Sequence, residues 1–424
     1  MTTYLEAVQK ILTHVRMMDA EEKPLFSSLG QVAAEDILAG VNLPLVDQAG
    51  PDGYAVRAAD ISHACHENPT TLKIIGSVRA GIVPRKSVVP GTAMRIMTGS
   101  IMPKGADCVV WFEDTDEPGN KSGPNLANPR LVRIHKTVNP GENVLKVGAT
   151  VKKDDLLVAK GGIISTAQMA ALLLTGCHTV RVIRRPVIAV IATGDELISS
   201  KGRLRPGRVI NCNSPAVASL VVHYGGIPRL LGIARDNEAS LMAKIRKGLD
   251  CDAIITSGGA SRGDYDLIRC VIGRIGELIF ARTNMGPGAS MAFGMVRREQ
   301  MGDSIPLFAL AGPPEGCMIN TETLVRPALF KMLGLQNTAH PVIEATTLDA
   351  SVGKKGNAFV RWSKLTPSGQ VTLGLKEKVG ALAAVASANC LTIVPAGGEV
   401  PLGGTVQALP LDWNAGTAAI PLGK

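Results

Sequence analysis

The middle part of the chain alternates between almost uninterrupted apolar runs and amphipathic stretches. Residues 186–194 read PVIAVIATG, and residues 252–259 read DAIITSGG after an intervening helical stretch. A strand with apolar side chains on both faces must be covered on both faces, as a parallel strand is between two layers of helices. Residues 186–335 therefore predict an α/β module with a mostly parallel sheet, which binds ligands beyond the carboxyl ends of its strands.

The rest of the chain predicts three further regions. Residues 45–140 contain short apolar runs separated by Gly, Pro and Asn, and residues 336–424 return to this spacing. Such runs are typical of β-structure, so we expect an all-β insertion and a small C-terminal β-barrel. Residues 1–44 and 141–185 are expected to form an N-terminal helical and linking domain. The predicted fold class is multidomain α/β plus β, since 424 residues exceed a single core.

Composition and charge narrow the classes of partner. Aromatic residues are 3% of the chain, too few for a platform that stacks single-stranded nucleic acid. The net charge of +9 is scattered along the sequence, which suits small anionic ligands. Eight cysteines without a CxxC pair indicate a reducing compartment, and no apolar run is long enough to span a membrane. We expect a cytoplasmic protein without nucleic-acid or membrane partners.

One candidate site is the turn after the second apolar run, IITSGGASRGDYD at residues 254–266. Its glycines would let backbone N–H groups approach an oxyanion just before the next helix. Asp264 and Asp266 would offer oxygen ligands to a divalent cation. A glycine turn followed by an N-capping aspartate would have the same residues, so the segment alone leaves both interpretations open.

A second acidic turn follows the first apolar run. Thr193, Gly194, Asp195 and Glu196 come directly after that strand, and Asn213 with Ser214 marks the start of the next helix. Two acidic turns on one sheet edge would repel each other unless a cation or proton lay between them. Glu196 would then bind metal or transfer a proton, although Asp195 could simply cap a turn.

Two turns in the predicted β region are ambiguous when taken singly. Asp52 and Gly53 form a strong hairpin signal, and Thr98-Gly99-Ser100 would either cradle a phosphate or end a strand. The segment HACH at residues 63–66 has the density of a metal site, but no further His or Cys lies close in sequence to complete one.

The order of the motifs along the chain resembles a known family. The stretches are DGYAVRAAD, AMRIMTGSIMPKGADCVVWFEDT, GENVLKVG, RRPVIAVIATGDEL, NCNS, ITSGGASRGDYD, GPGASMAFG, VRPALFKMLG and ASANCLTIVP. In this order they resemble the molybdopterin molybdenumtransferases, the family of the bacterial molybdenum-cofactor insertion enzyme and of the gephyrin E domain. The resemblance spans about residues 5–410.

This resemblance implies an activity and a set of site residues. It implies insertion of molybdate into adenylylated molybdopterin with release of AMP, with Mg²⁺, in a homodimer whose site lies at the subunit junction. The enzyme that adenylylates molybdopterin is an implied partner. The implied catalytic residues are Asp52, Glu196 and Asp264, and the implied metal ligands are Asp236, Asp264 and Glu196. The implied substrate-binding residues are Thr98, Gly99, Thr193, Gly194, Asn213, Ser214, Ser257, Gly258, Gly259, Ser261 and Gly288.

The chain departs from the family pattern around the expected pocket. Residues 286–290 are GPGAS where the family usually has Lys-Pro-Gly-Lys-Pro, so both lysines are absent. Residues 311–316 place Glu315 where the family has an uncharged residue, and Arg262 replaces another uncharged residue. Two hypotheses follow: a working transferase for molybdate or tungstate, or a catalytically weakened paralogue that carries molybdopterin or its adenylate, alone or beside an intact homologue.

Overall fold

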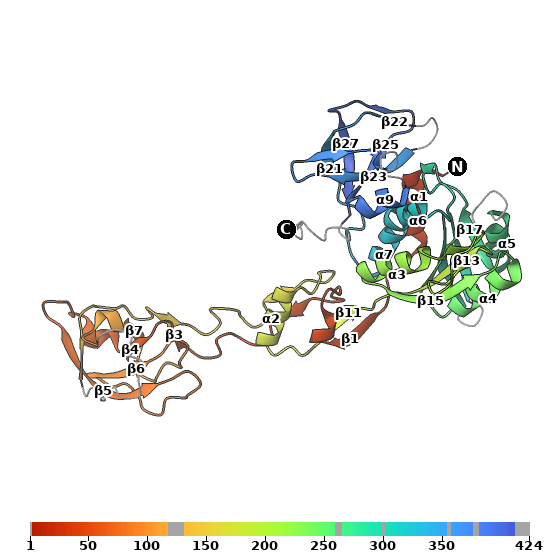
Figure 1. Ribbon diagram of the computed structural model, residues 1–424. Coiled ribbons are helices and arrows are strands. Elements are labelled where there is room, and N and C mark those ends of the chain that lie inside the picture. Colours follow the sequence, from red (N-terminus) through yellow and green to blue (C-terminus); the bar gives the residue numbers. More distant parts are fainter. Residues whose placement is uncertain are drawn as a thin grey trace.

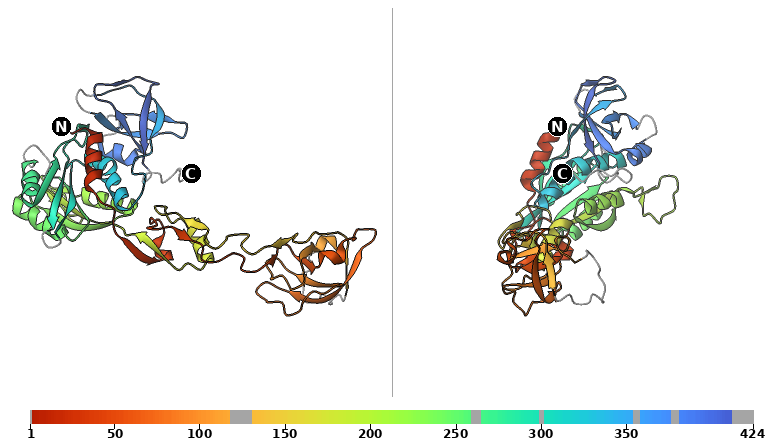
Figure 2. Two further views of the ribbon diagram at one scale, coloured as in Figure 1. Left: turned by 180° about the vertical axis from the view of Figure 1, so that it is seen from behind. Right: turned by 90° about the vertical axis from the view of Figure 1, so that its left-hand side faces the viewer.

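The computed structural model describes residues 2–117, 131–258, 265–298, 302–353, 358–375 and 381–411. The molecule is elongated (Figure 1). A β-rich part lies at one end, the α/β module and the C-terminal β-structure lie at the other, and a narrow linking part with α2 (Thr166–Leu174) joins them. The view from behind in Figure 2 shows the same arrangement, and the side view looks at the molecule from its β-rich end. None of the described helices is long and apolar enough to cross a membrane.

The central sheet of the α/β module has parallel strands on one side and an antiparallel pair at the other edge. Its order is β15 (Ile227–Ala234), β12 (Val187–Thr193), β16 (Ala253–Ser257), β20 (Asp303–Leu310), β19 (Ala292–Arg298) and β17 (Gly276–Phe280). The first four strands run parallel. The predicted mostly parallel sheet is confirmed, whereas β17 and β19 were not expected.

Alternating side chains of the central strands enter two separate cores. Val190 and Ile255 face one core and Ala189 and Ile254 face the other, so both faces are covered, as the continuous apolar runs predict. Helices connect the strands: α3 (Asn213–His223), α4 (Glu238–Gly248) and α5 (Tyr265–Ile275). Two short parallel strands, β13 (Leu197–Ile198) and β14 (Val209–Ile210), extend from the end of β12.

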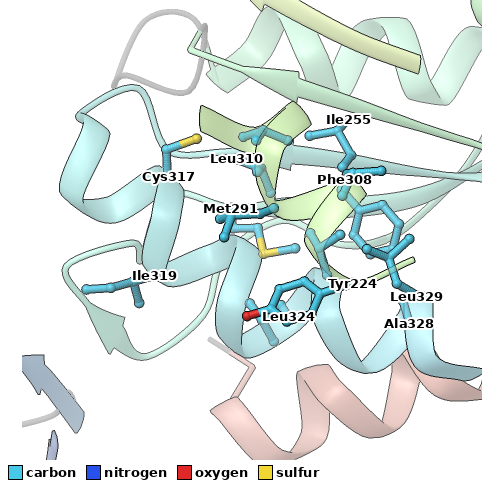
Figure 3. Packing of buried hydrophobic residues seen from close by; sticks show 14 of the residues in the cluster. Tyr224, Ile255, Met291, Phe308, Leu310, Cys317, Ile319, Leu324, Ala328 and Leu329 are labelled. Atoms are coloured by element: carbon cyan, nitrogen blue, oxygen red, sulfur yellow. The ribbon is translucent and has the colours of Figure 1, made fainter. Parts of the chain in front are cut away.

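A continuous helical segment covers one face of the sheet. It consists of α6 (Pro314–Asn320), the π-helix η4 (Thr321–Val325) and α7 (Arg326–Met332). Figure 3 shows its Leu324 and Ala328 with Ile255 and Phe308 of the sheet. The N-terminal helix α1 (Tyr4–His14) packs against α7 and joins this core, although the sequence groups it with the linking region.

The β-rich part contains a sheet in the order β7-β4-β6-β5-β8. Its strands are β4 (Gly53–Val56), β5 (Thr70–Val78), β6 (Thr92–Ile96), β7 (Cys108–Trp111) and β8 (Leu131–Ile134). Short helices lie at η2 (Ala58–Ile61) and η3 (Phe112–Asp114). Most of residues 116–130, a segment rich in Gly, Pro and Asn, lies outside the described residues.

The linking part consists of pairs of short antiparallel strands. The pairs are β1 (Ala20–Pro24) with β11 (Thr179–Ile183), β2 (Ile37–Leu38) with β10 (Leu156–Val158), and β3 (Gln48–Ala49) with β9 (Val144–Leu145). The short helix η1 (Leu25–Ser28) follows β1.

The predicted C-terminal β-barrel is confirmed. Strands β23, β24, β21, β27 and β25 pair in this order, and β25 pairs again with β23, which closes the ring. The strands of this region are β21 (Ile343–Thr347), β22 (Ser351–Val352), β23 (Ala358–Leu365), β24 (Gln370–Thr372), β25 (Cys390–Val394), β26 (Glu399–Val400) and β27 (Thr405–Pro410), with helix α9 (Ala381–Ser387). Strand β18 (Met285–Gly286) of the α/β module pairs with β23 and so connects the two parts.

Candidate functional site

The two turns predicted from sequence begin side by side. Strands β12 and β16 are parallel neighbours in which Ala192 is opposite Ser257, so both chains leave the sheet at the same edge. The Thr193 hydroxyl donates to the Ser257 carbonyl oxygen at 3.3 Å. The structure thus brings Thr193, Gly194, Ser257 and Gly258 together.

Gly258 is held in a conformation that favours glycine. Its φ is +87°, and a Cβ at this position would lie 2.4 Å from the carbonyl oxygen of Thr193. The obstructing atom belongs to the backbone of a buried strand, so it has little freedom to move. The absence of a side chain therefore lets the two turns pack backbone against backbone.

Ser257 has a buried hydroxyl group that finds no partner among the described residues. The residue is 1% exposed, and its Oγ makes no hydrogen bond within the described part of the chain. A buried hydroxyl group that lacks a partner is costly, so such groups usually bond to protein, water or a ligand. Since Ser257 directly precedes the Gly258 turn, its hydroxyl is available to an oxygen-rich ligand at this edge.

Asp195 is the centre of a polar network after β12. Its N–H donates to the Asp236 carboxylate at 3.0 Å. Its carbonyl oxygen accepts hydrogen bonds from the guanidinium groups of Arg208 and Arg235, the latter at 3.2 Å. The Glu196 carboxylate folds back over Gly194, since a Cβ built on that glycine would lie 2.5 Å from Glu196 Oε2. The structure therefore places the predicted acids Glu196 and Asp236 in neighbouring exposed loops, after β12 and after β15.

The start of α3 positions the chain that leaves β20. The Asn213 side-chain amide donates to the Gly312 carbonyl oxygen at 2.8 Å. Ser214 exchanges hydrogen bonds with Asn211, through its N–H at 3.1 Å and its hydroxyl at 2.9 Å. Both predicted residues thus lie at this edge of the sheet. Their hydrogen bonds hold the first turn of α3 and the chain after β20 in place.

Gly288 lies in the GPGAS loop, which is packed tightly against α6. Its carbonyl oxygen accepts from Asn320 Nδ2 at 3.0 Å, while Asn320 Oδ1 accepts from the Ala311 N–H at 3.1 Å. Gly288 has a φ of +104°, and a Cβ there would lie 2.6 Å from Asn320 Nδ2. The role of Asn320 was not predicted from the sequence. The one signal for it was a polar amide side chain in a helical segment whose other residues are mostly apolar, where the structure buries it fully.

Asp52, Thr98 and Gly99 form a separate cluster in the β-rich part. The Asp52 carboxylate accepts from the Thr98 N–H at 2.7 Å and from the Thr98 hydroxyl at 2.8 Å. The first and then the second of these bonds hold the pKa of Asp52 below its usual range. Strands β4 and β6, beside which this cluster lies, are at the opposite end of the molecule from β13 and β15 of the α/β module (Figure 1). The structure does not bring it together with Glu196 in the same chain.

Part of the predicted site cannot be placed. Gly259, Ser261 and Asp264, like Arg262, lie outside the described residues. In the ranges that the structure covers, no group of three His, Cys, Asp or Glu residues is arranged to hold a metal ion. The carboxylates of Glu196 and Asp236 are nevertheless the donor type that Mg²⁺ binds.

Comparison with known proteins identifies the family. Residues 2–176 match the family model described as MoeA N-terminal region (domain I and II), and residues 189–331 match the model described as probable molybdopterin binding domain. The molybdopterin molybdenumtransferase of Staphylococcus epidermidis is 32% identical over 400 residues, covering 92% of this chain and 91% of that protein. This chain belongs to the molybdopterin molybdenumtransferase family.

Other members of the molybdopterin molybdenumtransferase family agree in sequence and fold. The Bacillus subtilis molybdopterin molybdenumtransferase is 31% identical over 415 residues, covering 95% of this chain and 93% of that protein. The crystal structure of the molybdopterin biosynthesis MoeA protein from Pyrococcus horikoshii aligns with a TM-score of 0.83 at 31% identity, covering 96% of this chain and 98% of that chain. The resemblance found from the sequence motifs is confirmed.

Proposed function

We propose that this protein inserts molybdate into adenylylated molybdopterin and releases AMP during molybdenum cofactor biosynthesis. Membership of the family supports the reaction. The observation that carries the proposal in this chain is the buried Ser257 hydroxyl, which makes no hydrogen bond within the described residues and lies beside the left-handed turn at Gly258. This arrangement is suited to the phosphate oxygens of an anionic substrate at the carboxyl edge of the sheet.

The proposed roles follow from position and chemistry. Backbone N–H groups of the turn at Gly258, with the Ser257 hydroxyl, would donate to substrate phosphate oxygens. The N–H groups of Gly194 and Asp195 instead donate to Ala234 and Asp236. The exposed carboxylate of Glu196 would transfer a proton at this edge. We assign the cation to Glu196 and Asp236, completed by Asp264; when bound, Mg²⁺ would neutralise phosphate charge.

We also propose a homodimer in which the Asp52 cluster of one subunit completes the edge of the other. The elongated shape keeps β4 and β6, next to Asp52 and Thr98, far from β13, which follows Glu196, within one chain (Figure 1). The linking part exposes many large apolar side chains, which is typical of a surface covered by another protein. These are Phe26, Leu29, Leu38, Leu45, Leu156, Ile163 and Leu174.

Two further expectations accompany this function. The enzyme that adenylylates molybdopterin would be a partner, because it supplies the substrate. All eight cysteines are free, which fits a reducing compartment such as the cytoplasm.

The test is release of AMP by the purified protein supplied with adenylylated molybdopterin, molybdate and Mg²⁺. We expect turnover, and Glu196→Gln should lower its rate about 100-fold or more because a proton-transfer group is removed. Glu277→Gln, which removes an exposed carboxylate on β17, should leave the rate unchanged. Tight binding of the adenylate without any AMP release would contradict the transferase and support the carrier hypothesis.

A further inference from the structure

Two arginines converge on one backbone oxygen beside the candidate site. Arg208 Nη1 and Arg235 Nη1 both donate to the carbonyl oxygen of Asp195, the residue that follows the Gly194 turn. Each guanidinium carries five N–H donors, and these bonds use one from each. Among the residues that the structure describes, most of their hydrogen-bonding capacity therefore remains available to a ligand.

The backbone fixes both arginines near this turn. Arg208 immediately precedes β14, which is tied back to the turn by the bond from the Val209 N–H to the Glu196 carbonyl oxygen at 2.9 Å. Arg235 directly follows β15, whose last residue, Ala234, lies opposite Thr193 of β12. The two guanidinium groups lie close together because the segment before β14 and the loop after β15 both reach the same sheet edge.

Bringing two guanidinium groups to one oxygen has an electrostatic cost. Like charges at this separation repel, and the repulsion is only partly screened near a protein surface. The nearest visible compensation is the Asp195 carboxylate, 4.0 Å from Arg235 Nη1, but that side chain is 68% exposed and such pairs contribute little. An anion bound between the two arginines would remove the repulsion.

The neighbouring loop supplies no positive charge of its own. Residues 283–291, which contain the GPGAS segment fixed by Asn320, include neither Lys nor Arg. The loop between β13 and β14, which contains Arg208, has three more exposed cationic side chains: Lys201, Arg203 and Arg205. Positive charge at this edge thus comes from the segment after β12 and from the end of β15.

We propose that Arg208 and Arg235 form a binding pair for a tetrahedral oxyanion, either molybdate or a phosphate group. A guanidinium matches such an anion because its planar N–H groups can donate two parallel hydrogen bonds. This inference rests on the proposed function for its choice of ligands, and it assigns anion binding to residues outside the GPGAS loop.

The test measures binding of molybdate, inorganic phosphate and AMP separately by isothermal titration calorimetry. The double variant Arg208→Gln/Arg235→Gln should bind at least one of these anions about tenfold more weakly than the wild type, as expected for lost charged hydrogen bonds. The anion whose binding is weakened in the double variant is the one that the arginine pair binds. Arg246→Gln, which removes an exposed charge from α4, should bind all three like the wild type.

Two further measurements distinguish anion binding from a structural role. Added salt should weaken anion binding by the wild type more steeply than anion binding by the double variant. Arg208→Lys/Arg235→Lys keeps both charges and should recover part of the affinity, with unchanged melting temperatures for all variants. The inference is overturned if the wild type binds none of the three anions or if the double variant binds them all within twofold of it. AMP release by the wild type is scored separately, so failure of the pair and failure of the reaction are distinguishable.

Discussion

Gly258 is the residue whose replacement tests the geometry of the candidate site most directly. A methyl group there would require both a left-handed backbone and movement of the Thr193 carbonyl. We expect Gly258→Ala to lower the free energy of unfolding by about 1–3 kcal/mol through backbone strain, and to weaken substrate binding. Urea unfolding measures the first effect and calorimetry the second.

A matched control is available on α5. Gly273 lies in that helix, and a Cβ there would meet no atom within 4 Å. Gly273→Ala should therefore be neutral or stabilise the protein by about 0.5–1 kcal/mol, since alanine favours helix. Equal stability of the Gly258 and Gly273 variants would show that the Gly258 turn relaxes without cost.

Asp52 gives the β-rich part a pH dependence of known sign. Hydrogen bonds from Thr98 lower the pKa of Asp52 in the folded protein. Their stabilisation is therefore complete above the ordinary carboxyl pKa of about 4 and is lost as the pH falls through the lower folded value. The melting temperature should fall more steeply below about pH 4 in the wild type than in Asp52→Asn. Parallel curves for the two proteins would contradict this assignment.

At the level of residues, the sequence predicted which turn residues lie at the sheet edge, but not the contacts between residues that are distant in sequence. Thr193, Gly194, Ser257 and Gly258 were expected at one edge because each follows an apolar strand, and the structure brings them together. Asn320 was not expected, because its role depends on contacts with the GPGAS loop and the end of β20, which are distant in sequence.

At the level of elements, the parallel strands were predictable because burial on both faces leaves continuous apolar runs. Strand β17 was missed because it lies at the edge of the sheet, where burial is less uniform. Strand β19, between β17 and β20, was also missed although most of its residues are buried. The helical segment that covers the sheet begins at Pro314, since proline is acceptable in a first helical turn. The hydroxyls of Thr321 and Thr323 are buried and bond to carbonyl oxygens four residues earlier, so these polar residues do not mark a boundary.

The helical layer also predicts which thiols react. Burial raises the pKa of the Cys317 thiol in α6 to about 12, whereas Cys212 at the start of α3 is exposed. A thiol reagent should modify Cys212, Cys65 and Cys270 quickly in the native protein and leave Cys317 unmodified. Mass spectrometry of labelled peptides identifies the sites.

Ligand protection of Cys212 provides a second readout. Adenylylated molybdopterin should slow labelling of Cys212, which precedes Asn213 at the candidate site, but not of Cys65 in the β-rich part. If both thiols keep their rates while the ligand is bound, the ligand occupies another surface.

At the scale of the whole molecule, the separation of Asp52 from Glu196 predicts complementation between subunits. Asp52→Ala and Glu196→Ala should each be inactive alone. Co-expression of the two should restore about a quarter of wild-type AMP release, because half of randomly paired dimers would contain one intact junction. Absence of recovery in confirmed mixed dimers would place both residues' functions within one subunit.

The β-rich part leaves and rejoins the chain at a single point. Gln48 pairs with Leu145 and Ala49 with Val144, so the entry and exit of about a hundred residues lie on adjacent strands. A segment whose ends already touch can be exchanged for the corresponding piece of a relative without stretching either junction. Chimeras joined at these strands would exchange the whole β-rich part, including its aspartate and threonine cluster. The sheet edge of the α/β module would keep its own sequence.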